Sequence, residues 1–237
     1  MAGRQLTKAE RESWRIRLEQ EMSPDEMIRS VDELKDIVWA YMHVQAGLAF
    51  VRDAWTAGRF AQARAADAVR LWPGDRPDCE LMLQGRRELF EIVEADQPGR
   101  QRSAEYRDLI RRRELGEREQ VEIDEDWQSR AAMAPEMLRR AAIAKAAKGY
   151  DLDNGLIIHL NLMENGFKAQ EVEAAMQPCT AAAKDAFREV WVLWQNAAYP
   201  LWRNGEALPP DRRPKREEEM DRSASEAALW KSILEDD

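Results

Sequence analysis

The residue usage of this chain favours helices along its whole length. Ala, Leu, Glu, Arg and Gln dominate, and all of them form helices readily, whereas threonine occurs only three times in 237 residues. Runs that alternate β-branched and polar residues, as half-buried strands do, are absent. The sequence therefore predicts an all-α fold, built as a helical bundle or as stacked helical hairpins.

Capping signals and apolar spacing predict where these helices begin and end. Ser23-Pro24-Asp25-Glu26 has the pattern of a capping box with proline at the first helical position, and it predicts a long helical stretch to about Gly58. Asp153 and Thr180 are predicted to cap two later helices. The other predicted helices cover residues 7–21, 61–71, 77–93, 135–148 and 169–176, and the two that Asp153 and Thr180 cap cover 153–163 and 180–194.

A shift in charge and a group of prolines divide the chain. Residues 100–113 hold six arginines against two acids, and residues 114–126 hold seven acids and one arginine. Pro209, Pro210 and Pro214 indicate a second linker, and an amphipathic helix is predicted after it. We predict a helical unit over 1–98, a charged helix and linker over 99–131, a second helical unit over 132–204, and a flexible tail with a short helix over 205–237.

One short segment carries a partial resemblance. Gly58-Arg59-Phe60, Ala63 and Leu71 before Pro73 resemble the second half of a tetratricopeptide repeat, a helix-pair module that binds peptides. The preceding segment lacks the Trp and Tyr pattern of that repeat, and no second copy follows at its period of about 34 residues. The segment is therefore interpreted as a helical hairpin and not as a family match.

Sequence motifs of catalysis are absent. No two of the eleven glycines are two residues apart, so the glycine-rich dinucleotide motif cannot occur, and neither a P-loop nor a nucleophile elbow is present. His43 and His159, the only histidines, are predicted to be buried in helices rather than to bind a metal. Residues 151–155 fail the spacing of a calcium-binding loop, and the helix–turn–helix cadence of 167–185 lacks side chains suited to DNA bases. With 45 acidic residues no catalytic pair can be named, so we predict no catalytic residue, cofactor or metal ligand.

Elimination leaves three classes of function. The first is a non-enzymatic interaction protein, an adaptor, regulator or subunit of a larger assembly that presents helical surfaces to another protein. The second is a component that acts at nucleic acid, either through the arginines of 100–113 or as an acidic mimic of nucleic acid; the net charge of −9 disfavours direct binding. The third is a helical enzyme without a recognisable motif.

The prediction of an interaction protein gives the candidate site residues. Nine tryptophans suit either core positions or binding hot spots. The residues predicted to bind a partner lie on the tail helix and in the arginine-rich segment: Trp230, Ile233, Leu234, Arg107, Arg111, Arg112 and Arg113. Two separate cysteines and the lack of a signal segment or a membrane span predict a soluble, cytoplasmic protein.

Overall fold

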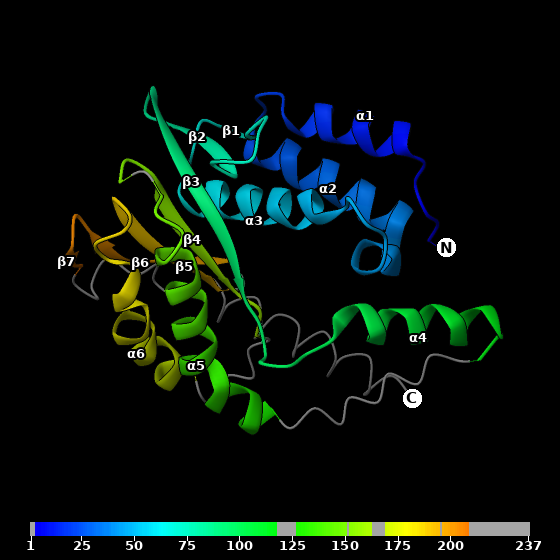
Figure 1. The fold of residues 1–237 in the computed structure, drawn as a ribbon. Coiled ribbons are helices and arrows are strands. Elements are labelled where there is room, and N and C mark those ends of the chain that lie inside the picture. The colour runs from blue at the N-terminus through cyan, green and yellow to red at the C-terminus, as the bar shows by residue number, and fades with distance from the viewer. Residues whose placement is uncertain (1–2, 118–126, 151, 163–168, 195, 209–237) are drawn as a thin grey trace, which may run out of the picture.

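The protein is a mixed α/β structure built around one sheet, with helices on both faces of that sheet (Figure 1). The computed structural model describes residues 3–117, 127–150, 152–162, 169–194 and 196–208. Its helices are α1 (Lys8–Leu18), α2 (Pro24–Val38), α3 (Ala49–Ala63), α4 (Arg102–Glu114), α5 (Trp127–Ala146) and α6 (Ala169–Thr180), with two short 3₁₀ helices, η1 (Trp39–His43) and η2 (Ala181–Ala183). Its strands are β1 (Ala68–Leu71), β2 (Cys79–Leu83), β3 (Arg86–Ala95), β4 (Gly155–Leu160), β5 (Glu189–Trp194), β6 (Ala197–Arg203) and β7 (Glu206–Ala207).

The seven strands lie in the sheet in the order in which they occur in the chain. β1, β2 and β3 form an antiparallel meander, β3, β4 and β5 run parallel, and β5, β6 and β7 are antiparallel again. Helices α4 and α5 connect β3 to β4, and α6 connects β4 to β5, as parallel pairing requires crossover connections. Strands from residues 68–95 and from 155–207 thus join one continuous sheet.

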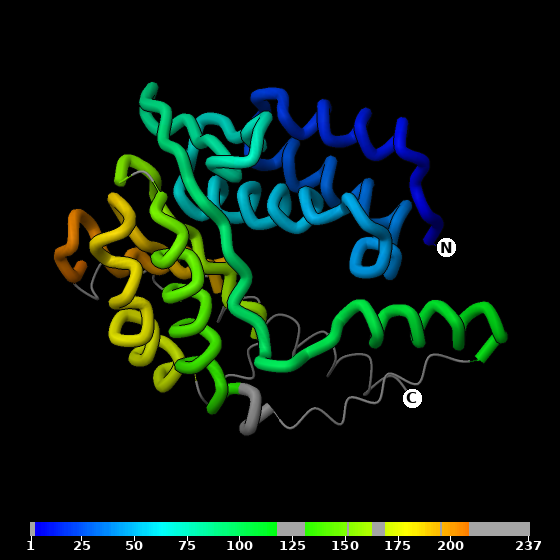
Figure 2. The backbone as a smooth tube through the Cα atoms, in the orientation of Figure 1, coloured from blue at the N-terminus to red at the C-terminus, as the bar shows by residue number. Residues whose placement is uncertain are grey.

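Each face of the sheet has its own hydrophobic core. Helices α1, α2 and α3 cover one face, where the Phe60 ring lies edge-on to Phe90 and Trp191, with ring centroids 5.1 and 5.5 Å away. Helices α5 and α6 cover the other face, around Leu138 and Phe187. Figure 2 shows the same two layers and the chain leaving β3 toward α4, which lies apart from the sheet. Burial on both faces explains why the central strands are strongly apolar.

The prediction of an all-α helical bundle is wrong, because four segments predicted as helices contain strands. Residues 77–93 form β2 and β3, and residues 153–163 include β4, so Asp153 caps no helix. Residues 180–194 end in β5, and residues 61–71 end in β1, which also removes the hairpin interpretation of that segment. All six residues of β5 are buried. A strand that is buried on both faces has no alternation of polar and apolar residues, so its sequence looks like a buried helix.

Helices α1 and α2 begin where the sequence predicts, but the helical stretch predicted to about Gly58 is not continuous, because α2 ends at Val38 and η1 and a turn separate it from α3. The Ser23 side chain accepts a hydrogen bond from the Glu26 backbone N–H and caps α2, with Pro24 at its first position. Thr7 and Glu10 form a reciprocal capping box at the start of α1. In the described part of the chain, no helix has both the length and the apolar character that a membrane crossing demands.

Candidate functional site

A buried lysine joins two carboxylates at the centre of the sheet. The Lys145 ammonium, near the end of α5, lies 2.8 Å from Glu91 Oε2 on β3 and 3.3 Å from Asp78 Oδ2, just before β2. Glu91 is 1% exposed and Lys145 is 8% exposed. We call Asp53, Asp78, Glu91 and Lys145 the carboxylate–lysine cluster.

The pairing of β2 with β3 fixes the two carboxylates relative to each other. Cys79 is the register partner of Phe90, so Asp78 reaches the level of Glu91 and Ile92. The Asp78 backbone N–H donates to the Phe90 carbonyl at 3.0 Å, and the Ile92 backbone N–H donates to Asp78 Oδ2 at 2.6 Å. Because Phe90 and Ile92 face the α3 side, Glu91 faces α5, where Lys145 meets it. Sheet register and helix packing therefore place Glu91 and Lys145, and two hydrogen bonds to β3 hold Asp78 beside them.

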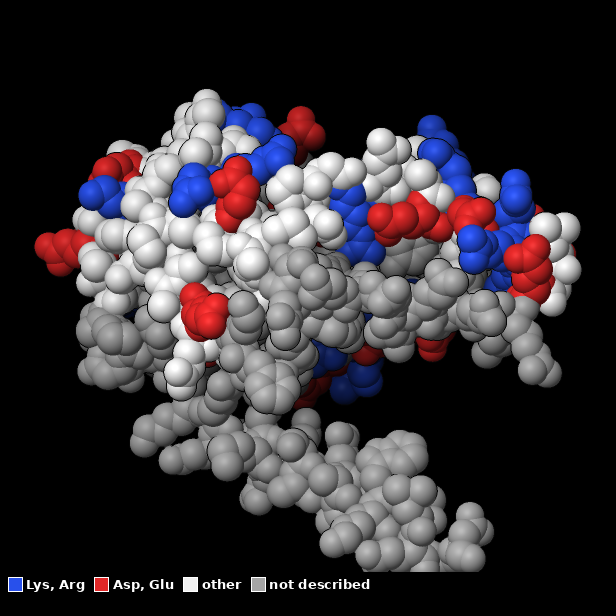
Figure 3. Space-filling view, turned by 90° about the horizontal axis from the view of Figure 1, so that it is seen from below, with Lys and Arg blue, Asp and Glu red and all other residues white. Residues whose placement is uncertain are grey.

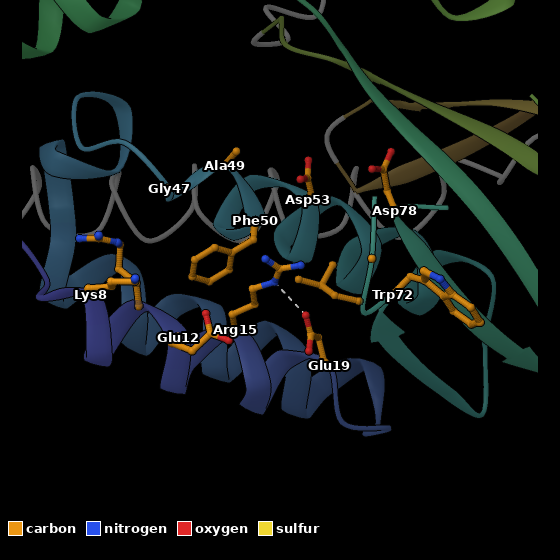
Figure 4. Close-up of a pocket in the computed structure, with 13 residues that line it drawn as sticks. Lys8, Glu12, Arg15, Glu19, Gly47, Ala49, Phe50, Asp53, Trp72 and Asp78 are labelled. Carbon is orange, nitrogen blue, oxygen red and sulfur yellow. Dashed lines mark hydrogen bonds and ion pairs between the residues drawn. The ribbon is translucent and has the colours of Figure 1, made fainter. Parts of the chain in front are cut away.

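Asp53 reaches the same site from α3. Figure 4 shows Asp53 on α3 and Asp78 before β2 pointing in the same direction, and both side chains line one cavity. Burial raises the pKa of Asp53 from 3.8 to about 7, and the Asp78 carboxylate adds to this effect. The protein therefore holds a carboxyl group here that changes its protonation near neutral pH.

The cluster carries more negative than positive charge. Burial lowers the pKa of Lys145, but Asp78 and Glu91 outweigh burial and raise it, so the ammonium stays charged. Burial, together with the neighbouring Asp78 carboxylate, raises the pKa of Glu91, although Lys145 acts to lower it. Glu91 Oε1 is buried and accepts no hydrogen bond from any described residue. A buried acceptor without a partner is costly, so this oxygen is suited to meet a further cation or donor.

The cavity that Asp53 and Asp78 share is lined by side chains of both charges. Its volume is about 390 Å³, and its other charged lining residues, at α1 and its C-terminal end, are Lys8, Arg11, Glu12, Arg15 and Glu19. Lys8 and Arg15 extend from α1 toward α3 in Figure 4. One of these cations, Arg15, pairs with Glu19 at 2.8 Å. The cations among these residues are suited to a ligand with anionic groups that approaches along α1.

The described residues include no group of three or more His, Cys, Asp or Glu side chains spaced to hold a metal ion. That spacing is what a fully protein-coordinated ion such as zinc requires. Mg²⁺ differs, because it keeps several waters and is commonly bound by one or two carboxylates together with substrate phosphates. Asp78 and Glu91 meet that smaller requirement.

The structure separates the arginines that the sequence singled out from this cluster. Arg107, Arg111 and Arg112 are exposed on α4, and Arg112 pairs with Asp108 at 2.8 Å. Arg113 is half-buried and packs over the Trp39 ring at 4.4 Å. Figure 3 shows blue and red side chains interspersed on this side of the molecule, not a uniformly basic surface. Trp230, Ile233 and Leu234 lie outside the described residues.

Sequence reasoning missed all four residues of the carboxylate–lysine cluster. The available signal was a charged residue inside an apolar run: Glu91 follows Leu89 and Phe90 and precedes Ile92 and Val93, and Lys145 is surrounded by alanines. A buried charge needs a buried partner, so such positions are candidates for a site. The partners, however, are 13 to 92 residues apart in sequence.

Comparison with protein-family models, with curated proteins and with solved structures finds no match to this chain.

Proposed function

We propose that the protein is a divalent-cation-dependent hydrolase of phosphodiester bonds in nucleic acid. One observation carries this proposal: Lys145 joins Glu91 to Asp78, and Asp78 lines a cavity together with Asp53 and with Lys8, Arg11 and Arg15 of α1. Of the three classes of function that the sequence left open, this proposal takes the enzyme in place of the non-enzymatic interaction protein. It also takes up the class that acts at nucleic acid. Both cysteines are buried free thiols, which agrees with action in a reducing compartment such as the cytoplasm.

Each residue of the cluster has a role in this proposal. Asp78, which lines the cavity, and Glu91, whose Oε1 accepts no hydrogen bond from a described residue, would hold a divalent cation, and that ion would supply charge neutralisation and a more acidic water. The Lys145 ammonium stabilises negative charge that develops on the phosphate oxygens during displacement. Asp53, with a pKa of about 7, accepts a proton from the attacking water. A new bond forms between water oxygen and phosphorus, the bond to the leaving alcohol oxygen breaks, that oxygen takes up a proton from solvent, and Asp53 releases its proton to solvent.

Three cations of α1 support a polyanionic substrate. Lys8, Arg11 and Arg15 lie on one side of α1, three to four residues apart, so they face the same way. Cations spaced along one helix face can contact successive phosphates of a nucleic-acid backbone.

Cleavage assays test the proposal directly. Purified protein is incubated with end-labelled single- and double-stranded DNA and RNA, with MgCl₂ or MnCl₂ or with EDTA. We expect cleavage that requires the cation and that falls at least about 100-fold in Asp78→Asn, Glu91→Gln and Lys145→Met, since each variant removes a charged group at the reacting phosphate. Glu136→Gln on the exposed side of α5 is the matched control and is expected to keep full activity.

Two results would contradict the proposal. One is a lack of cleavage of every substrate by protein whose folding is confirmed by circular dichroism. The other is cleavage that survives in folded Asp78→Asn and Glu91→Gln, which would indicate a contaminating nuclease.

The function of a non-enzymatic interaction protein, which the sequence favours, stays a prediction. The tail residues on which it mainly depends lie outside the described part of the chain. Co-purification with and without residues 209–237 is the test for it.

A further inference from the structure

A second cavity lies at the carboxyl ends of the parallel strands β3 and β4. Its volume is about 390 Å³, and its walls come from α3, η1, α4 and the ends of these two strands. Glu94 and His159, register partners on β3 and β4, line it, and Asn161 follows just beyond β4. Ligands of open α/β sheets bind at the carboxyl ends of strands, so this position is suited to a binding site.

Four flat rings line this cavity. The His43 and Tyr106 rings stack on each other with centroids 4.0 Å apart and an angle of 18° between their planes. Trp55 and His159 form a tilted pair with centroids 5.0 Å apart. Burial, followed by the charges of Arg102 and Arg52, lowers the pKa of His43 to about 4, so its ring is neutral near pH 7. Neutral flat rings offer surfaces on which a nucleobase can stack.

Positive charge surrounds these rings. Four cationic side chains line the cavity, Lys35, Arg52, Arg100 and Arg102, against the single carboxylate Glu94. Arg102 is held in place by Glu94 and Asp96, both at 2.7 Å. Arg52 lies 3.2 Å from Glu94, yet its side chain remains 45% exposed, and Lys35 is 39% exposed. Arg52 and Lys35 are therefore placed to meet a phosphate that arrives from solvent, while Arg102 organises the wall.

Two elements connect this cavity to the carboxylate–lysine cluster. On α3, Arg52 and Trp55 face the second cavity, and Asp53, next to Arg52, lines the first. On β3, Glu94 faces the α3 side of the sheet and Glu91 faces the α5 side, so a nucleic-acid strand bound on the α3 side would pass from Arg52 to Asp53 of the cluster.

We propose that this aromatic–basic cavity takes one unpaired nucleotide of a nucleic-acid strand whose backbone continues to the carboxylate–lysine cluster. The base stacks on the ring surfaces of Trp55 and the His43–Tyr106 pair, and Arg52 and Lys35 hold its phosphate. This inference rests on the proposed function and specifies its substrate as single-stranded nucleic acid or a strand end, since a base inside a duplex cannot reach the rings.

Binding without catalysis tests the inference separately from the proposed function. Fluorescence anisotropy with a labelled oligothymidylate in EDTA measures affinity while cation-dependent cleavage is off. We expect Trp55→Ala to weaken binding by about 5- to 150-fold, the loss typical of one base–aromatic stack. Arg52→Gln is expected to reduce the slope of log affinity against log salt by about one. Trp202→Ala on β6, outside this cavity, is the matched control and is expected to bind as the natural chain does.

The outcomes separate the two claims. Weaker oligonucleotide binding by Trp55→Ala, with unchanged binding of a blunt duplex, supports the inference even if no cleavage is found, in which case the proposed function alone fails. Equal affinity of folded Trp55→Ala and the natural chain for the oligonucleotide overturns the inference, even if Asp78→Asn abolishes cleavage. Lack of oligonucleotide binding by the natural chain overturns it as well.

Discussion

The Lys145 ammonium lies 2.8 Å from Glu91 Oε2, and this pair fastens the end of α5 to the middle of β3. Both side chains are almost completely buried, at 10% and 2% exposure. Asp78 shares the same ammonium at 3.3 Å. A buried charge of this kind is stable only while its partners are present.

Lys145→Met is expected to destabilise the protein by about 3–5 kcal/mol, because it leaves Glu91 and Asp78 buried without their cation. The double variant Lys145→Met with Glu91→Gln is expected to lose less stability than Lys145→Met, since one of the two buried negative charges is removed as well. Urea unfolding of both variants measures the free energy of unfolding. A single variant as stable as the natural chain would show that the pair contributes nothing to the fold.

Asp53→Asn is expected to change how stability depends on pH. The pKa of Asp53 is raised from 3.8 to about 7 in the folded protein. Between these two values the folded state binds a proton that the unfolded chain has released, so the contribution of Asp53 to stability falls as pH rises and is lowest above pH 7. We expect the Asp53→Asn variant and the natural chain to have equal free energies of unfolding below pH 4. Above pH 7 we expect the variant to be more stable by about 1–3 kcal/mol. Thermal unfolding across this range checks the sign, and an advantage of Asn that is largest in acid would contradict it.

Divalent cations are expected to stabilise the protein more at about pH 8 than at about pH 5.5, because carboxylates must lose their protons to bind metal. The measurement is the change of melting temperature on adding MgCl₂ in place of EDTA at each pH. Asp78→Asn should remove this change at both pH values. A cation effect that persists in Asp78→Asn would place the binding elsewhere.

Gly155→Ala is expected to cost about 1–3 kcal/mol, a typical cost of overpacking a core. A Cβ atom at Gly155 would collide with the ring carbons of Phe90, its register partner on β3. Chemical denaturation gives the loss, and a second substitution, Phe90→Leu, should recover part of it. If the double variant is only as stable as the sum of the single losses predicts, the collision is not the cause.

Alanine substitution should destabilise the protein more at Arg113 than at Arg111, although both residues lie in the last turn of α4. Arg113 packs over the Trp39 ring, whereas Arg111 is exposed. We expect Arg113→Ala to cost about 0.5–1 kcal/mol and Arg111→Ala to stay within about 0.5 kcal/mol of the natural chain. Thermal unfolding of the two variants side by side makes the comparison, and equal losses would argue against the contact with Trp39.

The sequence by itself determined the helices that lie on the surface of this protein. Thr7 and Ser23 cap α1 and α2 through hydrogen bonds to residues three positions later, so the information is local and can be read from the chain. The apolar run of β4 can also be seen in the sequence, but its secondary structure cannot. A short run that is buried on both faces suits a helix or a strand equally well. Only pairing with β3 and β5 decides that it is a strand.

Tertiary structure alone decided the candidate site. The distance from Asp78 to Lys145 depends on the register of β2 with β3 and on the packing of α5 over the sheet, neither of which is encoded in local spacing. His43 and His159, predicted as separate histidines in helices, lie on η1 and β4 and line the same cavity. The physical reason is the same for both sites: charges and rings far apart in sequence become neighbours only after the hydrophobic cores on the two faces of the sheet have formed.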